Sequence, residues 1–284
     1  MSVPGFRFDT AIQQPDGKII VAGWSNAAPE YPFALVRLNS DGSLDTSFGD
    51  GDGLVTTNVS LFGENINHVT LQPDGKIVVT GTFWNGTNEG IGVVRYNSDG
   101  SLDAGFGEGG VVIEEFANSD LDGISIAVQA DGKIIVAGQG WIGFGATDLL
   151  VLRYNADGTR DTSFGGGDGL VKVAGMDVGV DIQLLPDGRI LITGSTGDSF
   201  GVVRLNSDGT RDTTFEPVGT LGGTVAFTED GAPVVLDSDV HVFDTELGAQ
   251  FIYDGATLTL ERSGGANAED VFGATGNLVL SGGN

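Results

Sequence analysis

The sequence predicts an all-β fold made from a repeated unit, and three observations lead to this prediction. A turn followed by an apolar run occurs four times, as "QPDGKIIVAG" from Gln14, "QPDGKIVVTG" from Gln72, "QADGKIIVAG" from Gln129 and "LPDGRILITG" from Leu185. Glycines bound these runs, which are rich in β-branched residues, and both features are typical of strands. No window of about 11 to 18 residues has helical periodicity.

Each apolar run is the first of three blocks that recur in a fixed order. The second block is a strand that carries an arginine, "FALVRLN" from Phe33 in the first copy, and the third begins as "NSDGSLDTSFG" at Asn39. The aspartates of the first block, Asp16, Asp74, Asp131 and Asp187, are separated by 58, 57 and 56 residues. About four short strands in a unit of this size fit one blade of a β-propeller, and stacked blades bury faces that a single blade exposes. We predict a propeller-like array of four ~57-residue repeats over residues 1–220.

A known repeat family has the same pattern. "LQPDGKIVV", "GVVRYNSDGSLDAGFG" and "GVV", read from Leu71 to Val112, resemble the delta-60 repeat of bacteria, and the likeness extends over residues 1–220. The resemblance implies a β-propeller-like fold and an association with large secreted or surface proteins. It implies no catalytic residues.

Residues 221–284 depart from the repeat. The stretch "TEDGAPVVLDSDVHVFDTEL" from Thr228 resembles the opening of a cadherin-like, immunoglobulin-type module of large bacterial adhesins. A sandwich of that type needs about 100 residues, so we expect a linker and a truncated module. The resemblance implies calcium at the acidic cluster of this segment, although a solvated acidic edge is the simpler interpretation. The cluster consists of Asp237, Asp239, Asp244 and Glu246.

The third block has two interpretations, a calcium loop or a plain turn. Asn39, Asp41 and Asp45 stand at the spacing of a calcium loop, but Arg37 occupies the place of the first acidic ligand. A guanidinium group has no lone pair to donate, so we favour an Asn-x-Asp-Gly turn with glycine in the left-handed conformation. We expect Arg37 and its equivalents to pair with a carboxylate such as Asp45. Those equivalents are Arg95, Arg153 and Arg204.

Composition limits the partners. With 39 acidic and 13 basic residues the formal net charge is -26, which disfavours nucleic acid and anionic membranes. The absence of cysteine excludes disulfides and thiolate metal sites. No apolar run reaches the roughly 18 residues that a membrane span needs, and "MSVPGFRFDT" is no visible signal peptide. We nevertheless expect a secreted or bacterial surface location, as part of a longer multidomain chain.

Few residues are candidates for chemistry. "GQGWIG" from Gly138 lacks the strand–helix context of a dinucleotide site, and His68 and His241 read as ordinary surface or strand residues. Three tryptophans, one in each of the first three repeats, follow the apolar runs closely and could stack on a sugar from variable loops. Packing between blades is the alternative. The three are Trp24, Trp84 and Trp141.

These observations predict a non-enzymatic structural or interaction region, related to adhesion. The alternative is a carbohydrate-binding module that uses the three tryptophan loops. We expect no required cofactor, with calcium as the one candidate, and a protein or glycan surface as the partner. Alignment of Asp16 with Asp74 leaves the first repeat without a counterpart of the strand "GLVTT" at residues 53–57, so we also expect residues 218–227 to complete it by pairing near Val3 to Phe8.

Overall fold

A computed structural model describes residues 5–26, 31–59, 64–115, 119–142, 147–173, 175–196 and 199–215. The chain divides into two units, Met1–Gly219 and Thr220–Asn284, and all described residues belong to the first. The expected cadherin-like module over residues 221–284, its acidic cluster and the closing segment 218–227 therefore lie outside the described residues.

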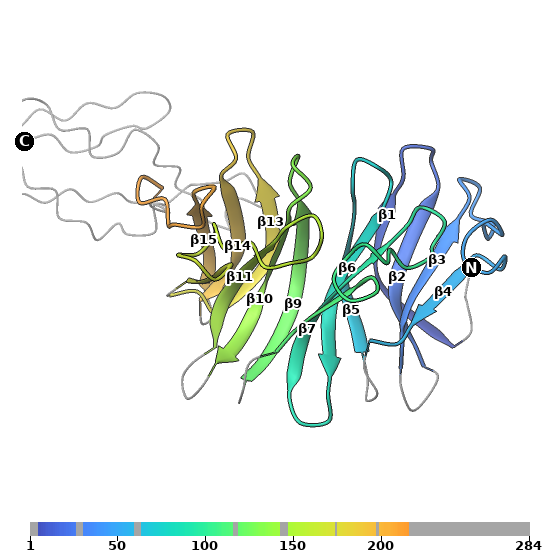
Figure 1. Cartoon of the computed structure of the whole chain (residues 1–284), viewed down its shortest axis with the longest axis horizontal. Coiled ribbons are helices and arrows are strands. Elements are labelled where there is room, and N and C mark those ends of the chain that lie inside the picture. Colours follow the sequence, from blue (N-terminus) through green and yellow to red (C-terminus); the bar gives the residue numbers. More distant parts are fainter. Residues whose placement is uncertain are drawn as a thin grey trace, which may run out of the picture. The chain divides into compact units, whose positions relative to one another are not determined.

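The first unit consists of four antiparallel sheets, one for each repeat (Figure 1). We call each sheet a blade, and the blades agree with the predicted all-β array of four units. The strands of blades 1 and 2 are β1 (Phe6–Gln13), β2 (Ile19–Ser25), β3 (Phe33–Leu38), β4 (Leu54–Thr57), β5 (Glu64–Leu71), β6 (Ile77–Trp84), β7 (Glu89–Tyr96) and β8 (Val111–Glu114). Those of blades 3 and 4 are β9 (Ser119–Val128), β10 (Ile134–Ile142), β11 (Asp148–Tyr154), β12 (Leu170–Val173), β13 (Val178–Leu184), β14 (Ile190–Thr196) and β15 (Ser199–Leu205).

Blade 1 has all four strands, so the expectation that the first repeat lacks one is wrong. The "GLVTT" segment forms β4, which pairs back onto β3 of its own repeat with Leu54 opposite Val36. A hydrogen bond from the Arg37 N–H to the Gly53 carbonyl begins this return. Alignment of the repeats assigned this strand to the following repeat, because residues 39–53 separate β3 from β4 and no local pattern indicates that the two strands pair. Blade 4 shows three strands among the described residues, β13, β14 and β15.

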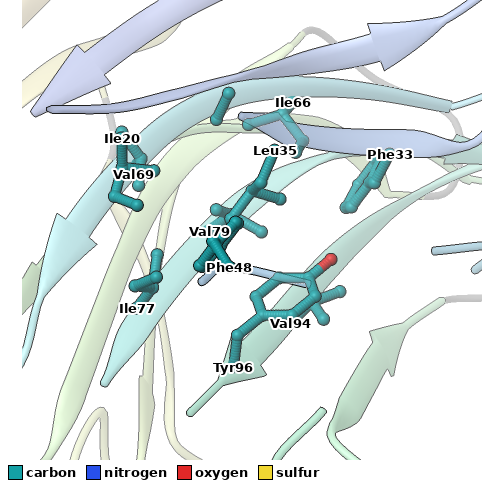
Figure 2. Packing of buried hydrophobic residues seen from close by; sticks show 11 residues of the cluster. Ile20, Phe33, Leu35, Phe48, Ile66, Val69, Ile77, Val79, Val94 and Tyr96 are labelled. Carbon is teal, nitrogen blue, oxygen red and sulfur yellow. The ribbon is translucent and has the colours of Figure 1, made fainter. Parts of the chain in front are cut away.

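Consecutive blades pack face to face, and the hydrophobic core lies between them. The first strands form a series of neighbours, with β1 against β5, β5 against β9, and β9 against β13. Between blades 1 and 2 the core includes Phe33, Leu35 and Phe48 from blade 1 and Val94 and Tyr96 from blade 2, all fully buried (Figure 2). Two further clusters fill the gaps between blades 2 and 3 and between blades 3 and 4. Each blade therefore depends on its neighbours to bury its apolar surface.

The Asn-x-Asp-Gly segments form the turns that we expected. In blade 1 the carboxylate of Asp41 accepts hydrogen bonds from the Ser43 N–H at 2.9 Å and the Ser43 hydroxyl at 2.6 Å. The Asn39 amide donates to the Ser43 hydroxyl at 3.0 Å, and Gly42 takes a φ of 84°. The hydroxyl bonds hold the pKa of Asp41 below its usual value. The Oδ1 atom of Asp41, which a calcium loop would offer to the ion, is thus engaged by the chain itself.

The arginines of the third strands are paired, as predicted. Each guanidinium donates through Nε to an aspartate eight residues later, at 2.6 to 2.8 Å, in the pairs Arg37–Asp45, Arg95–Asp103, Arg153–Asp161 and Arg204–Asp212. The side chains of the third pair are each only 6% exposed. A second cation, Lys133, binds the same Asp161 carboxylate at 2.8 Å. Burial raises the pKa of Asp161, but the hydrogen bonds from Lys133 and Ser163 and the charge of Arg153 together outweigh burial, so the pKa lies well below its usual range.

This pair also fastens each blade to the next. Arg37 Nη1 donates to the carbonyl of Ser98 in the turn of blade 2 at 2.5 Å, and its guanidinium lies 4.6 Å from the ring centre of Phe48. Phe48 in turn packs under Gly100 of that turn, where a Cβ would come within 2.8 Å of the ring. The same contacts join blade 2 to blade 3 and blade 3 to blade 4, through Arg95 and Ala156 and through Arg153 and Ser207. We call this arrangement the corner interlock.

Candidate functional site

A β-bulge interrupts the first strand of every blade at the same place. The register of pairing with the second strand skips one residue in each, namely Asp9, Asn67, Ile124 and Val180. In a regular strand successive side chains point to opposite faces, whereas a bulge places an extra residue in the ladder and changes the direction of the side chains around it. The repeats therefore carry a feature that is often found beside functional sites.

The glycine that ends each "KIIVAG"-type run makes room for this bulge. A Cβ on Gly81 would overlap the carbonyl oxygen of Asn65, and one on Gly138 would overlap that of Asp122. Gly23 and Gly194 meet the first strands of their own blades in the same way. The repeated glycine is thus a condition for the bulged first strand as well as the end of an apolar run.

The bulges of blades 2, 3 and 4 open onto one hollow with a volume of about 420 Å³. Successive residues line it in pairs, Asn67 with His68 from β5 and Val180 with Asp181 from β13. Asp122 and Ile124 of β9 complete the lining. The bulge explains how two neighbours in the sequence reach the same space. In contrast to the corners, equivalent positions of the four blades here carry different side chains.

One polar network in the hollow joins β5 to β9. The Asn67 amide donates to Asp122 Oδ1 at 2.8 Å and to the Gly123 carbonyl at 2.9 Å. The Thr82 hydroxyl donates to the same Asp122 oxygen. Asn65 donates to Asn67 Oδ1 at 2.6 Å, which fixes the orientation of the Asn67 amide. The Asp122 carboxylate is therefore held by its Oδ1 atom.

A second network joins β5, β9 and β13. The Ile126 N–H donates to His68 Nδ1 at 3.0 Å, so the proton of the neutral ring is on Nε2. The buried Ser125 hydroxyl lies 3.2 Å from the same Nδ1 and donates to Asp181 Oδ1 at 3.4 Å. Burial lowers the pKa of His68, and the charge of Asp181 partly opposes this. In a serine-nucleophile triad the histidine lies between the serine and the aspartate. Here the serine lies between the histidine and the aspartate, and His68 Nδ1 already accepts the Ile126 N–H, so these residues are not such a triad.

Both carboxylates of the hollow keep an oxygen available. Asp122 and Asp181 each accept their hydrogen bonds through Oδ1. Within the described part of the chain, no hydrogen bond reaches either Oδ2 atom. Asp181 is exposed and Asp122 half-buried. Nearby, burial raises the pKa of Glu89, and the charges of Asp120 and Asp122 add to the effect. The hollow thus combines two accessible carboxylates with a neutral imidazole.

The three tryptophans lie in second strands rather than in free loops. Trp24 is in β2, 5.9 Å from the ring of Tyr31 and 5.6 Å from the Arg7 guanidinium. Trp84 ends β6 and is 37% exposed, and Trp141 lies near the end of β10. Among the described side chains, neither Trp24 nor Trp84 lines the hollow around His68. Ligand binding by these tryptophans stays a prediction.

Calcium binding and location also stay predictions. Among residues 5–215 that the structure describes, no three His, Asp or Glu side chains are grouped to hold a metal ion. The acidic cluster from Asp237 to Glu246 lies outside them. In the same described ranges, no helix is long and apolar enough to cross a membrane.

The repeats match one family model, described as "Domain of unknown function (DUF5122) beta-propeller". The matched segments are residues 14–48, 72–106, 129–164 and 185–215, one in each blade. The chain is a β-propeller-repeat protein. Each match begins at the first turn of a blade and ends at Phe48 or its equivalent, Phe106, Phe164 or Phe215. The match leaves out the bulged first strands, and with them the hollow. No curated protein sequence matches this propeller-repeat protein.

Solved structures that resemble the chain include several carbohydrate-active proteins. An α-L-arabinofuranosidase from Clostridium thermocellum is 11% identical, with a TM-score of 0.37 over 71% of this chain and 68% of the other. A glycosyl hydrolase from Bacteroides ovatus is 12% identical, with a TM-score of 0.33 over 72% and 69%. A GH43_12 protein from a capybara gut metagenome is 12% identical, with a TM-score of 0.37, and the chain spans 38% of its length.

The expectation of a non-enzymatic structural or adhesive region is not supported by these comparisons, since the solved structures include an arabinofuranosidase and a glycosyl hydrolase, although at 11 to 12% identity the likeness concerns the fold alone. That expectation is corrected here. In the sequence, no single repeat contains a set of catalytic side chains. The polar groups of the hollow come instead from three different blades, so no single repeat contains the set.

Proposed function

We propose that the hollow is the active site of a hydrolase that cleaves a glycosidic bond in a neutral, sugar-like substrate. The observation that carries the proposal is the pair of carboxylates, Asp122 and Asp181, which come from neighbouring blades and line one open hollow. Glycoside hydrolysis in most families uses two carboxyl groups on either side of the bond that breaks.

The lining of the hollow suits a polyhydroxylated ligand. Carboxylate and amide oxygens accept hydrogen bonds from hydroxyl groups, and the Nε2–H of His68 can donate one. Ile124 and Val180 add apolar surface for the C–H face of a ring. A volume of about 420 Å³ lies within the usual range of small-molecule sites. The net charge of -26 favours a neutral sugar over an acidic one.

The reaction needs one carboxyl group to give a proton to the leaving oxygen and one ionised carboxylate to activate water or attack the sugar. Each aspartate can take either role, because each lines the hollow and its hydrogen bonds within the described residues end on Oδ1. His68, neutral and held at Nδ1 by the Ile126 N–H, orients a hydroxyl and transfers no proton. Substrates with strongly activated leaving groups distinguish the two roles, since they do not need the acid.

The experiment is a hydrolysis assay of the full chain on a panel of aryl glycosides and neutral oligosaccharides. Asp122→Asn and Asp181→Asn should each lower kcat/KM by about 10²–10⁴-fold on the oligosaccharide. The variant that replaces the proton-donating aspartate should keep most of its activity on a dinitrophenyl glycoside, whose leaving group needs no protonation. Asp131→Asn, in an exposed turn away from the hollow, is the matched control. An active wild type whose two hollow variants keep full activity would refute the assignment, as would a wild type inactive on every substrate.

A further inference from the structure

The two end blades carry the unmatched halves of the blade-to-blade interface. Phe33, Ile91 and Leu149 occupy equivalent positions in blades 1 to 3, and each is fully buried under the next blade. The equivalent residue of blade 4, Phe200, is 75% exposed. The side of blade 4 that bears Phe200 therefore corresponds to the side that every other blade buries. We call Leu191, Phe200, Val202, Arg204 and Phe215 the tail face.

The donor half of the corner interlock is present at the tail face. Arg204 is bound to Asp212 at 2.8 Å and lies 4.5 Å from the ring centre of Phe215, as in the other blades. In the first three blades the same arginine also reaches a carbonyl of the following turn. Within the described ranges no such carbonyl bonds to Arg204, whose side chain is 18% exposed where its counterparts are 6 to 8%.

The acceptor half is present on blade 1. In blades 2 to 4 the glycine of the Asn-x-Asp-Gly turn lies against the phenylalanine of the preceding blade, at 2.8 to 3.0 Å from a Cβ built on Gly100, Gly158 or Gly209. Gly42 has the same left-handed conformation, and a Cβ there would meet nothing within 4 Å. The turn of blade 1 thus has the shape of a receptor for a phenylalanine that the described residues do not supply.

The apolar surface beside this turn is also uncovered. Ile66, Val69 and Ile77 of blade 2 are at most 2% exposed because blade 1 covers them. Their equivalents in blade 1 are Phe8 and Ile19, which are half-buried, and Ala11, which is exposed. We call Phe8, Ala11, Ile19, Val21 and the turn around Gly42 the head face.

We propose that the tail face of one molecule binds the head face of a second copy of this chain. Arg204 then reaches the carbonyl of Ser40 in the partner, and Phe215 fills the space over Gly42. Three interfaces inside the molecule already join a face like the tail face to a face like the head face of the next blade. The tail face is therefore complementary to the head face of a second copy. Because the two faces differ, the contact is head to tail, and copies add until a ring closes or a filament forms.

The test is sedimentation velocity of the full chain over a range from about micromolar to about 100 micromolar, at a salt concentration that screens the negative charge. We expect the wild type to associate as its concentration rises. Ala11→Asp places a charge in the head face, and Phe200→Asp places one in the tail face. Both positions are exposed, so we expect both variants to fold. Each variant alone should associate at least about 100-fold more weakly, since a charge enters an apolar contact. Ile113→Asp, at the exposed position of β8 and outside both faces, is the matched control and should behave as the wild type.

Mixing the two variants gives the most specific result. Each retains the face that the other lacks, so a mixture of Ala11→Asp and Phe200→Asp should form a one-to-one dimer and stop there. A wild type that stays monomeric over the whole range would overturn the proposal. It would also fail if either single variant still associates fully, or if the mixture forms no dimer. A monomeric wild type that Phe200→Asp destabilises would place the occupant inside the same chain instead.

Discussion

The outer corners and the inner first strands are built from the same four repeats, yet they differ in how their residues vary. At the corners every blade has the same arginine–aspartate pair at the same spacing, as in Arg37–Asp45 and Arg153–Asp161. In the first strands one equivalent position carries Thr10, His68, Ser125 and Asp181 in turn, although the bulge itself is repeated.

The difference shows how a repeat protein separates architecture from function. A contact that joins each blade to the next must be made by the same residues every time, because the geometry of the joint is the same. A site that binds one ligand needs different groups on different sides. Repetition therefore indicates the scaffold, and divergence at equivalent positions of a repeated backbone feature indicates the candidate site.

Breaking a corner should have the largest effect on stability. Arg153→Leu removes one of the two cations that bind the buried Asp161 carboxylate, leaving Lys133, and also removes the bond to the turn of blade 4. We expect the free energy of unfolding to fall by about 3–5 kcal/mol, the range found when one member of a buried ion pair is lost. Urea denaturation followed by far-UV circular dichroism measures it.

Arg204→Leu is the matched control for this substitution. Arg204 makes the same ion pair but, within the described residues, no contact to a following blade. Its replacement should therefore cost clearly less than that of Arg153. Equal losses would mean that the ion pair acts within each blade and that the link between blades contributes nothing.

A smaller loss should follow when the fit between blades is disturbed without removing a charge. Gly100→Ala and Gly42→Ala both place a Cβ on a left-handed residue, which costs about 1–2 kcal/mol. At Gly100 the Cβ also comes within 2.8 Å of Phe48, whereas at Gly42 the space is open. Overpacking should add about 1–3 kcal/mol at Gly100 only. Thermal unfolding of the two variants measures the difference, and identical melting temperatures would contradict the described packing.

The sequence predicted the blades, the turns and the arginine pairing because each rests on local patterns that occur four times. Gly42 in its turn and Asp45 opposite Arg37 follow from turn chemistry and from the cost of burying an unpaired charge. The fourth strand of blade 1 was misplaced because its pairing with β3 spans a long corner.

The hollow was missed for a different reason. Asn67, His68, Asp122 and Asp181 are brought together only by the packing of three blades, and no local pattern marks them. The signal that could have revealed them was available, since the repeated glycine at Gly81 and Gly138 requires a close approach by the first strand. That strand then varies at aligned positions between repeats.

The pH dependence of stability should show the smallest effect. Because His68 has a lowered pKa in the folded protein, its neutral ring is favoured there. This contribution is fully present above the unfolded pKa of about 6.5 and is lost as the pH falls from that value through the folded pKa. His68→Gln keeps an acceptor for the Ile126 N–H and does not titrate. Between about pH 7.5 and about pH 5, urea denaturation should show a smaller loss of stability for the variant. Equal losses would contradict the buried, neutral state of His68.

The most direct test makes one chemical change in both regions. Asp161→Asn and Asp122→Asn each replace a carboxylate by an amide of the same shape, one at a corner and one in the hollow. Unfolding free energy and glycoside hydrolysis are measured together on both variants. Asp161→Asn should lose about 3 kcal/mol of stability because two cations lose their anion, while its activity persists at temperatures where it is folded. Asp122→Asn should keep its stability to within about 1 kcal/mol, since the bonds to Oδ1 remain, and should lose hydrolysis. The reverse pattern, or equal effects of the two changes on both quantities, would contradict the separation of scaffold and site.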